Sequence, residues 1–541
     1  MPLIRCLRQA VASRLGIWLG VAGVACVGLA AGWRAVLLVV AVSLGGCASL
    51  PGDVSRPSSY ARPDVAGTAL ARAAAASLAT ARGGDSGFRL LPGGDEAFDA
   101  RLALVRRAEK TLDVQYYLIA SDATGLAFLR ELSNAAARGV RIRVLVDDLY
   151  AAGQDDLLAG FASRRHVELR MFNPLPVRGG GVMRRVLFSM HEFSRINRRM
   201  HNKLLIADGS FAISGGRNVA NEYFDRSAEA NFIDMDVLSA GPVVREMAAL
   251  FDRFWNSDAA YPIASLAGHA GDAATFDARV GTAGNTGDGR DQQPGLDSEL
   301  TAGRVGLVTA AARFLADPPP QGDGTAATGT VARAHLEIVR AARSSVQLAS
   351  PYFIPGGRAM AALAEVRARD VDVSVLTNSL ATTDEPLVHF GYARYRAALL
   401  DVGVTLHELI GVTASHGGFA FLGTGSGRGG SLGRLHSKLT VIDGERVFIG
   451  SMNMDPRSAR FNTEAGLVIH SVELARRLTS FLEGNRRDSS YEVRAVGAEK
   501  RLSWHAGTGD SRRELAMEPG ADGRAGLGVR VLALLVDEAM L

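Results

Sequence analysis

The chain has 541 residues, of which 47% are hydrophobic and 21% are charged. This ordinary globular composition excludes a disordered, a collagenous or a wholly coiled-coil protein, and the length suggests roughly three or four domains, or two large ones. Sixty Lys and Arg residues against 56 Asp and Glu residues leave a net charge of +4. A balance this even does not indicate the strongly basic surface of a nucleic-acid-binding protein.

Residues 1–47 have the pattern of a targeting segment. Arginines precede two apolar runs, at 15–31 and 35–44, and the second run leads into Gly45-Gly46-Cys47. A basic start, an apolar stretch and small residues before a cysteine are typical of a bacterial lipoprotein signal, in which Cys47 carries the lipid. The alternative is an uncleaved signal anchor, although either run is shorter than the roughly 20 residues of a spanning helix. Both alternatives predict a bacterial membrane-associated chain whose body faces the periplasm.

Periodic structure follows a segment rich in Ala, Ser, Arg and Pro at residues 48–85, which we expect to be a tether with room for one Ala-rich helix. The first half of the body spans residues 86–263. Within it, the patterns at 112–119, 125–138 and 140–146 predict a strand, a helix and a second strand, which together form a β-α-β unit.

The same unit recurs in the second half, residues 301–488. Val346 matches Val114 at an offset of 232 residues, and a strand, a helix and a strand follow in the same order. A repeat of this size predicts two homologous halves, each with a mixed sheet flanked by helices. The Gly- and Ala-rich stretch at 264–300 indicates a linker between the halves, and residues 489–541 a C-terminal tail.

Each half carries one copy of a motif that contains histidine, lysine, aspartate and asparagine. The first copy comprises His201, Lys203, Asp208 and Asn218, and the second His436, Lys438, Asp443 and Asn453. The two histidines are 235 residues apart, close to the repeat offset, and two of the chain's four lysines fall in these motifs. A chance match in register is on the order of one in 10⁵ from composition, so the paired motif indicates a functional site.

Each motif spans a predicted hairpin, because apolar runs flank an Asp-Gly turn signal at Asp208 and again at Asp443. In an extended segment residues i and i+2 share a face, so His201 and Lys203 project together, as do their counterparts in the second half. An imidazole beside an ammonium and an amide suits attack on phosphorus, since Lys and Asn can hold the non-bridging oxygens. With two lysines supplying positive charge, this chemistry demands no metal.

These paired motifs resemble those of the phospholipase D superfamily, in which two H-x-K-x4-D motifs combine into one site across a pseudo-twofold axis. Further stretches resemble the bacterial cardiolipin synthases, in particular their C-type branch: 215–224 (GGRNVANEYF), 234–244 (DMDVLSAGPVV), 350–356 (SPYFIPG) and 388–399 (VHFGYARYRAAL). The resemblance covers about residues 86–490. It implies an α/β fold of two homologous phospholipase D-like halves, each a mixed β-sheet flanked by helices, that form one active site at a pseudo-twofold interface.

The resemblance also implies a ping-pong phosphatidyl transfer that uses no cofactor. One histidine attacks the phosphodiester and becomes a phosphatidyl-histidine, and the other protonates the leaving alcohol and then deprotonates the acceptor. By analogy we assign His201 as the nucleophile and His436 as the acid and base, while the sequence alone also allows the reverse. Asp208 and Asp443 are motif members whose place at the hairpin turns suits geometry more than chemistry.

Further site residues follow from the same resemblance. The expected phosphate ligands are Asn218, Asn453 and Ser451. Gly216 stands where the second half has Ser451, so a hydroxyl contact is expected from one side only.

Each histidine is expected to be oriented by a carboxylate. Glu464 matches the family position in the second half, and Asp234 matches it in the first half by the strand that follows. Glu229 remains an alternative, because it has the same 28-residue spacing from its histidine as Glu464. Tyr116 and Tyr117 end a strand that is expected to point towards the site. One of them could line the pocket, and the alternative is that they pack in the core.

Three activities compete. A cardiolipin synthase transfers a phosphatidyl group to the headgroup hydroxyl of phosphatidylglycerol, a hydrolytic phospholipase D releases phosphatidic acid, and a phosphodiesterase cleaves nucleic acid. The membrane-targeting segment and the near-neutral charge favour the synthase over a nuclease. We therefore expect phospholipid substrates, with phosphatidylglycerol and also phosphatidylethanolamine as candidates, and no nucleic acid. An inactive scaffold is disfavoured because both motifs are intact. The sequence leaves open the need for an accessory protein and the oligomeric state.

Overall fold

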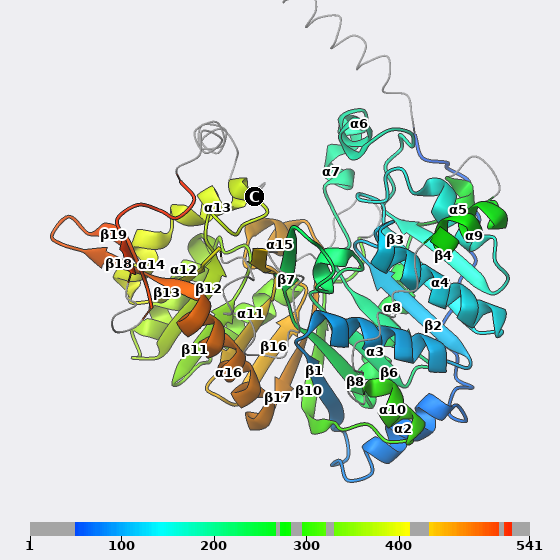
Figure 1. The fold of residues 1–541 in the computed structure, drawn as a ribbon, viewed down its shortest axis with the longest axis horizontal. Coiled ribbons are helices and arrows are strands. Elements are labelled where there is room, and N and C mark those ends of the chain that lie inside the picture. Colours follow the sequence, from blue (N-terminus) through cyan, green and yellow to red (C-terminus); the bar gives the residue numbers. More distant parts are fainter. Residues whose placement is uncertain are drawn as a thin grey trace, which may run out of the picture.

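Two similar α/β halves make up this computed structural model, which describes residues 49–266, 271–282, 295–320, 329–411, 432–507 and 513–521. In Figure 1 the first half lies to the right, mostly in blue to green, and the second half to the left, mostly in yellow-green to red. The segment predicted to target the chain to a membrane, including Cys47, and the end of the predicted C-terminal tail lie outside the described residues. No helix in the described ranges is long and apolar enough to span a membrane.

The first half contains seven helices and nine strands in the described residues. The helices are α2 (Ala69–Ser77), α3 (Gly94–Arg107), α4 (Ala123–Ala137), α5 (Asp155–Ala162), α6 (Val182–Leu187), α7 (Phe193–Ile196) and α8 (Pro242–Trp255). The strands are β1 (Ser86–Leu91), β2 (Thr111–Tyr116), β3 (Arg141–Asp147), β4 (Val167–Phe172), β5 (Leu204–Ala207), β6 (Phe211–Gly215), β7 (Ala230–Ile233), β8 (Asp236–Ala240) and β9 (Ala260–Pro262). Short 3₁₀ turns are η1 (Met190–Glu192), η2 (Asn221–Tyr223) and η3 (Ile263–Ser265).

The remainder of the described chain forms the second half and its connection to the first. Its helices are α9 (Ala273–Thr282), α10 (Leu296–Thr301), α11 (Thr330–Arg340), α12 (Gly356–Arg367), α13 (Pro386–Ala393), α14 (Arg396–Val402), α15 (Pro456–Arg460) and α16 (Val472–Ser489). Its strands are β10 (Val308–Ala316), β11 (Ser345–Ala349), β12 (Asp372–Asn378), β13 (Thr405–Leu409), β14 (Leu432–Leu435), β15 (Leu439–Ile442), β16 (Arg446–Gly450), β17 (Ala465–His470), β18 (Ser490–Val496), β19 (Arg501–Ala506) and β20 (Arg513–Leu515).

The strand order repeats between the halves. In the first half it is β4-β3-β2-β5-β6-β8-β1, with β2, β3 and β4 parallel and the other pairs antiparallel. In the second half it is β13-β12-β11-β15-β16-β17-β10, with the same pattern of directions. This matched order confirms the predicted pair of mixed sheets.

One strand joins the two halves into a single sheet of 18 described strands. The first residues of β10 pair with β1, and the residues that follow pair with β17. Helices α8 and α16 cover one face across this junction, where Phe88, Leu439 and Phe481 belong to one apolar core. Because helices also cover the opposite face, the strands are buried on both sides, which explains their nearly continuous apolar runs.

Both predicted hairpins are confirmed. Strands β5 and β6 are antiparallel, as are β15 and β16. In the first turn φ is 46° at Asp208 and 55° at Gly209, and in the second it is 55° at Asp443 and 65° at Gly444. Two successive positive φ angles characterise a type I′ turn, whose twist matches that of the flanking strands.

The segment predicted to be a tether is docked on the first half. The Ala-rich helix forms as α2, with Leu70 and Ala73 buried. Upstream of it, the Ser59 N–H donates to Asn256 over 3.0 Å, and the Arg170 guanidinium donates to the Pro57 carbonyl over 2.6 Å. The described part of 48–85 is therefore built into the body, because its carbonyls and small side chains satisfy groups of the first half.

Two other stretches that were predicted to be connecting segments also contain ordered structure. The stretch 264–300, expected to be a linker, contains α9 and α10, and Phe276 of α9 packs on Phe161 with ring centroids 5.5 Å apart. The tail expected at 489–541 contains β18 and β19, which extend the second sheet beyond β13. In both cases a few apolar residues at helical or strand spacing form ordered structure within a stretch rich in Gly, Ala and charged residues.

Candidate active site

The two motif histidines lie where segments of the two halves are exchanged. Strand β7 of the first half pairs in parallel with β14 of the second, and the His436 N–H donates to the Ile233 carbonyl over 2.9 Å. Reciprocally, Met200 bridges to Thr463, and the His201 N–H donates to the Thr463 carbonyl over 3.0 Å. The backbone of each half thus positions the histidine of the other.

The orienting carboxylates are exchanged in the same way. His201 Nδ1 lies 2.9 Å from Glu464 Oε2, and His436 Nδ1 lies 2.6 Å from Asp234 Oδ2. The sequence predicts one carboxylate within each half, and the structure pairs each one with the opposite histidine. With Nδ1 bonded to a carboxylate, Nε2 of each imidazole is free for nucleophilic or acid–base chemistry. The alternative carboxylate, Glu229, is exposed to solvent.

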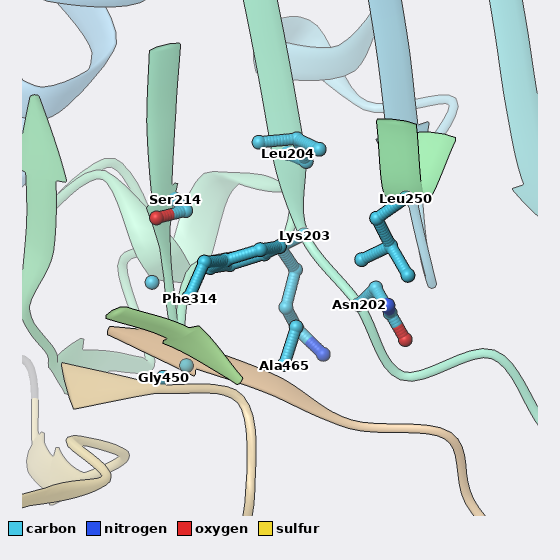
Figure 2. A pocket seen from close by; sticks show the side chains of 10 residues that line it. Asn202, Lys203, Leu204, Ser214, Leu250, Phe314, Gly450 and Ala465 are labelled. Atoms are coloured by element: carbon cyan, nitrogen blue, oxygen red, sulfur yellow. The ribbon is translucent and has the colours of Figure 1, made fainter. Parts of the chain in front are cut away.

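The motif lysines lie under the histidines. Lys203 Nζ donates to the His201 carbonyl over 2.7 Å, and Lys438 Nζ donates to the His436 carbonyl over 2.5 Å. Figure 2 shows the Lys203 side chain extending past Ala465 of β17, in a small cavity lined by strands of both halves. Burial lowers the pKa of Lys438 to about 8 and that of Lys203 well below its usual value, so this poorly solvated place disfavours the ammonium form of both lysines.

The two histidine–carboxylate pairs differ in their electrostatics. Burial and the neighbouring lysines lower the pKa of both imidazoles, that of His436 to about 4. Burial raises the pKa of Glu464 to about 7. Burial also opposes ionisation of Asp234, but contact with His436 and the nearby Lys438 brings its pKa below the usual value. At neutral pH Asp234 is therefore an anion, whereas Glu464 is poised between its two protonation states.

The two motif asparagines present unsatisfied amides. Asn218 Nδ2 donates to the Tyr223 hydroxyl over 2.9 Å, while the Oδ1 atoms of Asn218 and Asn453 are buried without a partner in the described residues. Because amide oxygen and nitrogen exchange places on a flip, each asparagine can present a donor to a bound group. The equivalent Oδ1 atoms of the two asparagines both lack a hydrogen-bond partner, which suits a ligand that is bound from both halves.

Ser451, which is expected to be a phosphate ligand, lies against the orienting carboxylate of the second half. Its hydroxyl donates to Glu464 Oε2. In the first half a Cβ at Gly216 would lie 2.2 Å from Asp234 Oδ1. The glycine therefore makes room for the shorter carboxylate side chain, and the serine bonds the longer one, which explains why the two motifs differ at this position.

The two motif aspartates bind backbone at the hairpin turns. Asp208 accepts three N–H groups, from Glu109, Lys110 and Thr111, at 2.8 to 2.9 Å. Asp443 accepts from the equivalent amides of Arg343, Ser344 and Ser345. The turns lie at the opposite end of the hairpins from the histidines, so these two aspartates hold the start of β2 and β11 and do not touch the other motif side chains.

Replacing Asp208 with alanine is expected to destabilise the fold by roughly 2–4 kcal/mol, because buried N–H groups lose their acceptor and alanine disfavours the positive φ. Asp208→Asn keeps an acceptor oxygen and tolerates this φ, so a loss of about 1 kcal/mol is expected. Urea unfolding of both variants measures the difference. Equal stability of the alanine variant and the unmodified chain would contradict the capping role.

Two tyrosines pack against the histidine rings: Tyr117, for which the sequence left a pocket-lining place open, and Tyr223, which the sequence did not assign to the site. The Tyr117 ring lies 5.1 Å from that of His201, and the Tyr223 ring 5.1 Å from that of His436. Tyr352, 235 residues after Tyr117, donates to Asp384 over 2.8 Å. Tyr116 lies in the core instead, bonded to Arg101. Adding the 235-residue spacing of the two histidines to position 117 gives position 352, so the sequence repeat could have pointed to Tyr352.

Comparison with known proteins identifies the family. The family described as "Cardiolipin synthase, PLD-like domain" matches residues 102–255 and 336–484, the two halves that carry the motifs. The chain belongs to this family. It is 35% identical to cardiolipin synthase C of Escherichia coli over 453 residues, which cover 82% of this chain and 94% of that protein. It is also 26% identical to a cardiolipin synthase of Staphylococcus aureus, over 77% of this chain and 71% of that protein.

Among solved structures, a phosphatidylserine synthase of Haemophilus influenzae is similar with a TM-score of 0.49 and 12% identity, over 74% of this chain and 86% of that one. In the described ranges no three His, Cys, Asp or Glu side chains form a cluster suited to a metal ion.

Proposed function

We propose that this protein makes cardiolipin by transferring a phosphatidyl group from a donor phospholipid to phosphatidylglycerol through a phosphatidyl-histidine. The observation that carries the proposal is the exchanged pair of His–carboxylate contacts above two buried lysines. Hydrolysis needs no second lipid. Two relatives that cover 82% and 77% of the chain are named cardiolipin synthases, and this name favours a lipid alcohol as the acceptor.

In the first step, His201 Nε2 attacks the phosphorus of the donor lipid. The bond between phosphorus and the headgroup oxygen breaks, and that oxygen takes a proton from His436 Nε2 and leaves as an alcohol. Lys203 and Lys438, with the two motif asparagines, stabilise the negative charge that builds on the non-bridging oxygens.

In the second step, the headgroup hydroxyl of phosphatidylglycerol gives its proton to neutral His436 and attacks the same phosphorus. The P–N bond to His201 breaks, so the nucleophile is restored and cardiolipin leaves. The cycle needs one histidine that changes protonation twice. Because the pKa of His436 is about 4 without substrate, the first step requires that the bound phosphodiester anion raises that pKa.

The carboxylates support the assignment of the two roles. Ionised Asp234 faces His436 and stabilises its imidazolium form. Glu464, whose pKa burial raises to about 7, faces His201 and supports a positive charge there less strongly. A phosphodiester anion bound between the lysines further favours protonation of His436. His201 is therefore the neutral nucleophile and His436 the acid.

The same proposal covers the location and the donor. A lipid on Cys47, or the uncleaved segment before it, holds the body at the periplasmic face of the cell membrane. Phosphatidylglycerol is the acceptor, and either phosphatidylglycerol or phosphatidylethanolamine supplies the phosphatidyl group.

Lipid analysis by mass spectrometry tests the function. The chain and its His201→Ala variant are expressed in cells that lack their own cardiolipin synthases. Cardiolipin that appears only with the unmodified chain supports the proposal. Phosphatidic acid rising without cardiolipin would identify a hydrolytic phospholipase D instead.

The alkaline limit of activity is expected to follow Lys438. Its pKa of about 8 means that the ammonium form is present below that pH and is lost above it, so kcat/KM should fall about tenfold per pH unit beyond roughly pH 8. In Lys438→Arg the larger guanidinium fits poorly, so activity should fall at least about 100-fold. Because the guanidinium stays protonated, the activity that remains should not decrease above roughly pH 8. Lys500→Arg, at an exposed site, is the control. An unchanged alkaline limb in Lys438→Arg would assign it to another group.

A further inference from the structure

The segment between β4 and the first motif exposes an unusual set of apolar side chains. Met183 and Leu187 of α6, Met190 of η1 and Phe193 of α7 are 81, 49, 46 and 37% exposed, and they account for four of the ten large exposed hydrophobic side chains of the described residues. These four residues define the α6–α7 surface. Clustered exposed apolar residues mark an interaction site more often than scattered ones do.

Buried ion pairs attach the segment that carries the α6–α7 surface to the first half. Asp148, which is fully buried, accepts from Arg178 over 2.6 Å and from Arg185 over 2.8 Å. Arg199 Nη1 donates to buried Asp147 over 3.0 Å. Because these ion pairs fix both ends of the segment on the end of β3, the apolar side chains are held outward by the fold.

The α6–α7 surface lies at the same end of the sheet as the histidines. Only four residues separate Ile196, the last of α7, from His201. Asn197 accepts from Arg457 of α15 over 2.8 Å, and α15 follows the second motif closely. In Figure 1, α6 and α7 project beyond the first half, on the side of the view towards which α15 also lies.

The charge of the segment complements an anionic surface. Residues 177–200 contain six arginines and one acidic residue, and four of these arginines are paired with Asp147, Asp148 or Glu192. Of the other two, Arg184 is exposed and donates to the Gly179 carbonyl, and neither Arg184 nor Arg198 forms an ion pair within the described ranges. Arginines beside exposed Leu, Met and Phe are typical of elements that lie in the headgroup region of a bilayer, with the apolar side chains inserted and the guanidinium groups among phosphates.

We propose that the α6–α7 surface inserts into the interfacial layer of an anionic phospholipid membrane and so places the site mouth against the headgroups. The described chain begins near α6 in the view of Figure 1, two residues after Cys47, the predicted lipid attachment point. A lipid on Cys47 and the α6–α7 surface would therefore contact the same membrane. The inference rests on the proposed function in one respect: the proposed substrate is a lipid and therefore lies in a membrane.

Insertion can be measured without turnover. In the full chain carrying His201→Ala, an environment-sensitive fluorescent amino acid replaces Leu187, and the protein is reconstituted in vesicles of phosphatidylethanolamine and phosphatidylglycerol. Quenching by lipids that carry a nitroxide on the acyl chain reports depth. Val472, 67% exposed at the start of α16, is the matched control position, because β17 leads to it at the hairpin-turn end of the sheet, away from the histidines.

The expected result is a blue-shifted emission at position 187 that lipid nitroxides quench at least about threefold more than at position 472, and that weakens when phosphatidylcholine replaces phosphatidylglycerol. Emission at 187 that stays water-like, or that is shielded from both aqueous and lipid quenchers by protein, overturns the proposal. Cardiolipin formation by the active chain without insertion would reject this inference alone, and insertion without cardiolipin formation would reject the proposed function alone.

A second measurement uses activity. The double variant Met183→Ser, Leu187→Ser is expected to raise the apparent KM for vesicle lipid about tenfold with an unchanged unfolding midpoint, because less apolar surface enters the membrane. Val472→Ser is expected to leave KM unchanged. Equal KM values for both variants would contradict the docking role.

Discussion

The His201→Ala variant is expected to lose cardiolipin formation by at least about 10⁴-fold, because no other group can form the covalent intermediate. The fold should survive, since the backbone N–H of position 201 still bonds to Thr463. Mass spectrometry of lipid extracts and a thermal unfolding curve measure the two parts. His470→Ala, at an exposed strand end, is the control and should retain full activity.

The companion variant His436→Ala separates the two histidine roles. Bis(4-nitrophenyl) phosphate has a leaving group that needs no protonation, so the first step should remain measurable in His436→Ala as a burst of nitrophenolate, while His201→Ala shows none. The reverse pattern, a burst in His201→Ala and none in His436→Ala, would exchange nucleophile and acid. Turnover with natural lipid in both variants would eliminate the two-histidine mechanism.

The second large effect is expected at Asp234. Asp234→Asn removes the anion that orients His436 and stabilises its protonated form. If the amide nitrogen of Asn faces Nδ1, it donates to that atom and favours the tautomer with the proton on Nε2. Loss of an equivalent carboxylate in a catalytic triad costs about 10⁴-fold, so we expect a decrease of roughly 10² to 10⁴ in kcat for cardiolipin formation. Glu464→Gln should be less severe, because the pKa of Glu464, near 7, already leaves part of it protonated.

Glu229→Gln is the matched control for Asp234→Asn. Glu229 has the same spacing from its histidine as Glu464 but is exposed, so its substitution should change kcat less than twofold. The activated diester adds a second test, because Asp234→Asn should recover much of its first-step rate on a substrate that needs no acid. Equal losses with lipid and with the activated diester would show that Asp234 acts on something other than proton donation by His436.

Several features of this protein follow from local sequence. The β-α-β units have the periods of a strand and a helix, and the two Asp-Gly turns require positive φ, so the hairpins that carry His201 and His436 could be predicted from a few neighbouring residues. The duplicated motif and its 235-residue offset indicated two halves because a repeated pattern is visible without any knowledge of contacts. The same locality made Asp208 and Asp443 recognisable as turn residues.

Other features depend on contacts that no local pattern encodes. Nothing near Asp234 in the chain indicates that its partner is His436, 202 residues away, because the pairing arises from the exchange of β7 and β14 between halves. Burial at that junction also decides the pKa values of Glu464 and Lys438, since desolvation depends on the surrounding protein and not on neighbours in sequence. The docked segment before α2 and the strands β18 and β19 were missed for a similar reason: their ordering depends on distant groups such as Asn256 and β13. The sequence by itself determined the chemistry available to this protein, namely two His–Lys pairs on two hairpins, whereas only the tertiary structure decided which carboxylate serves which histidine and which surface faces outward beside them.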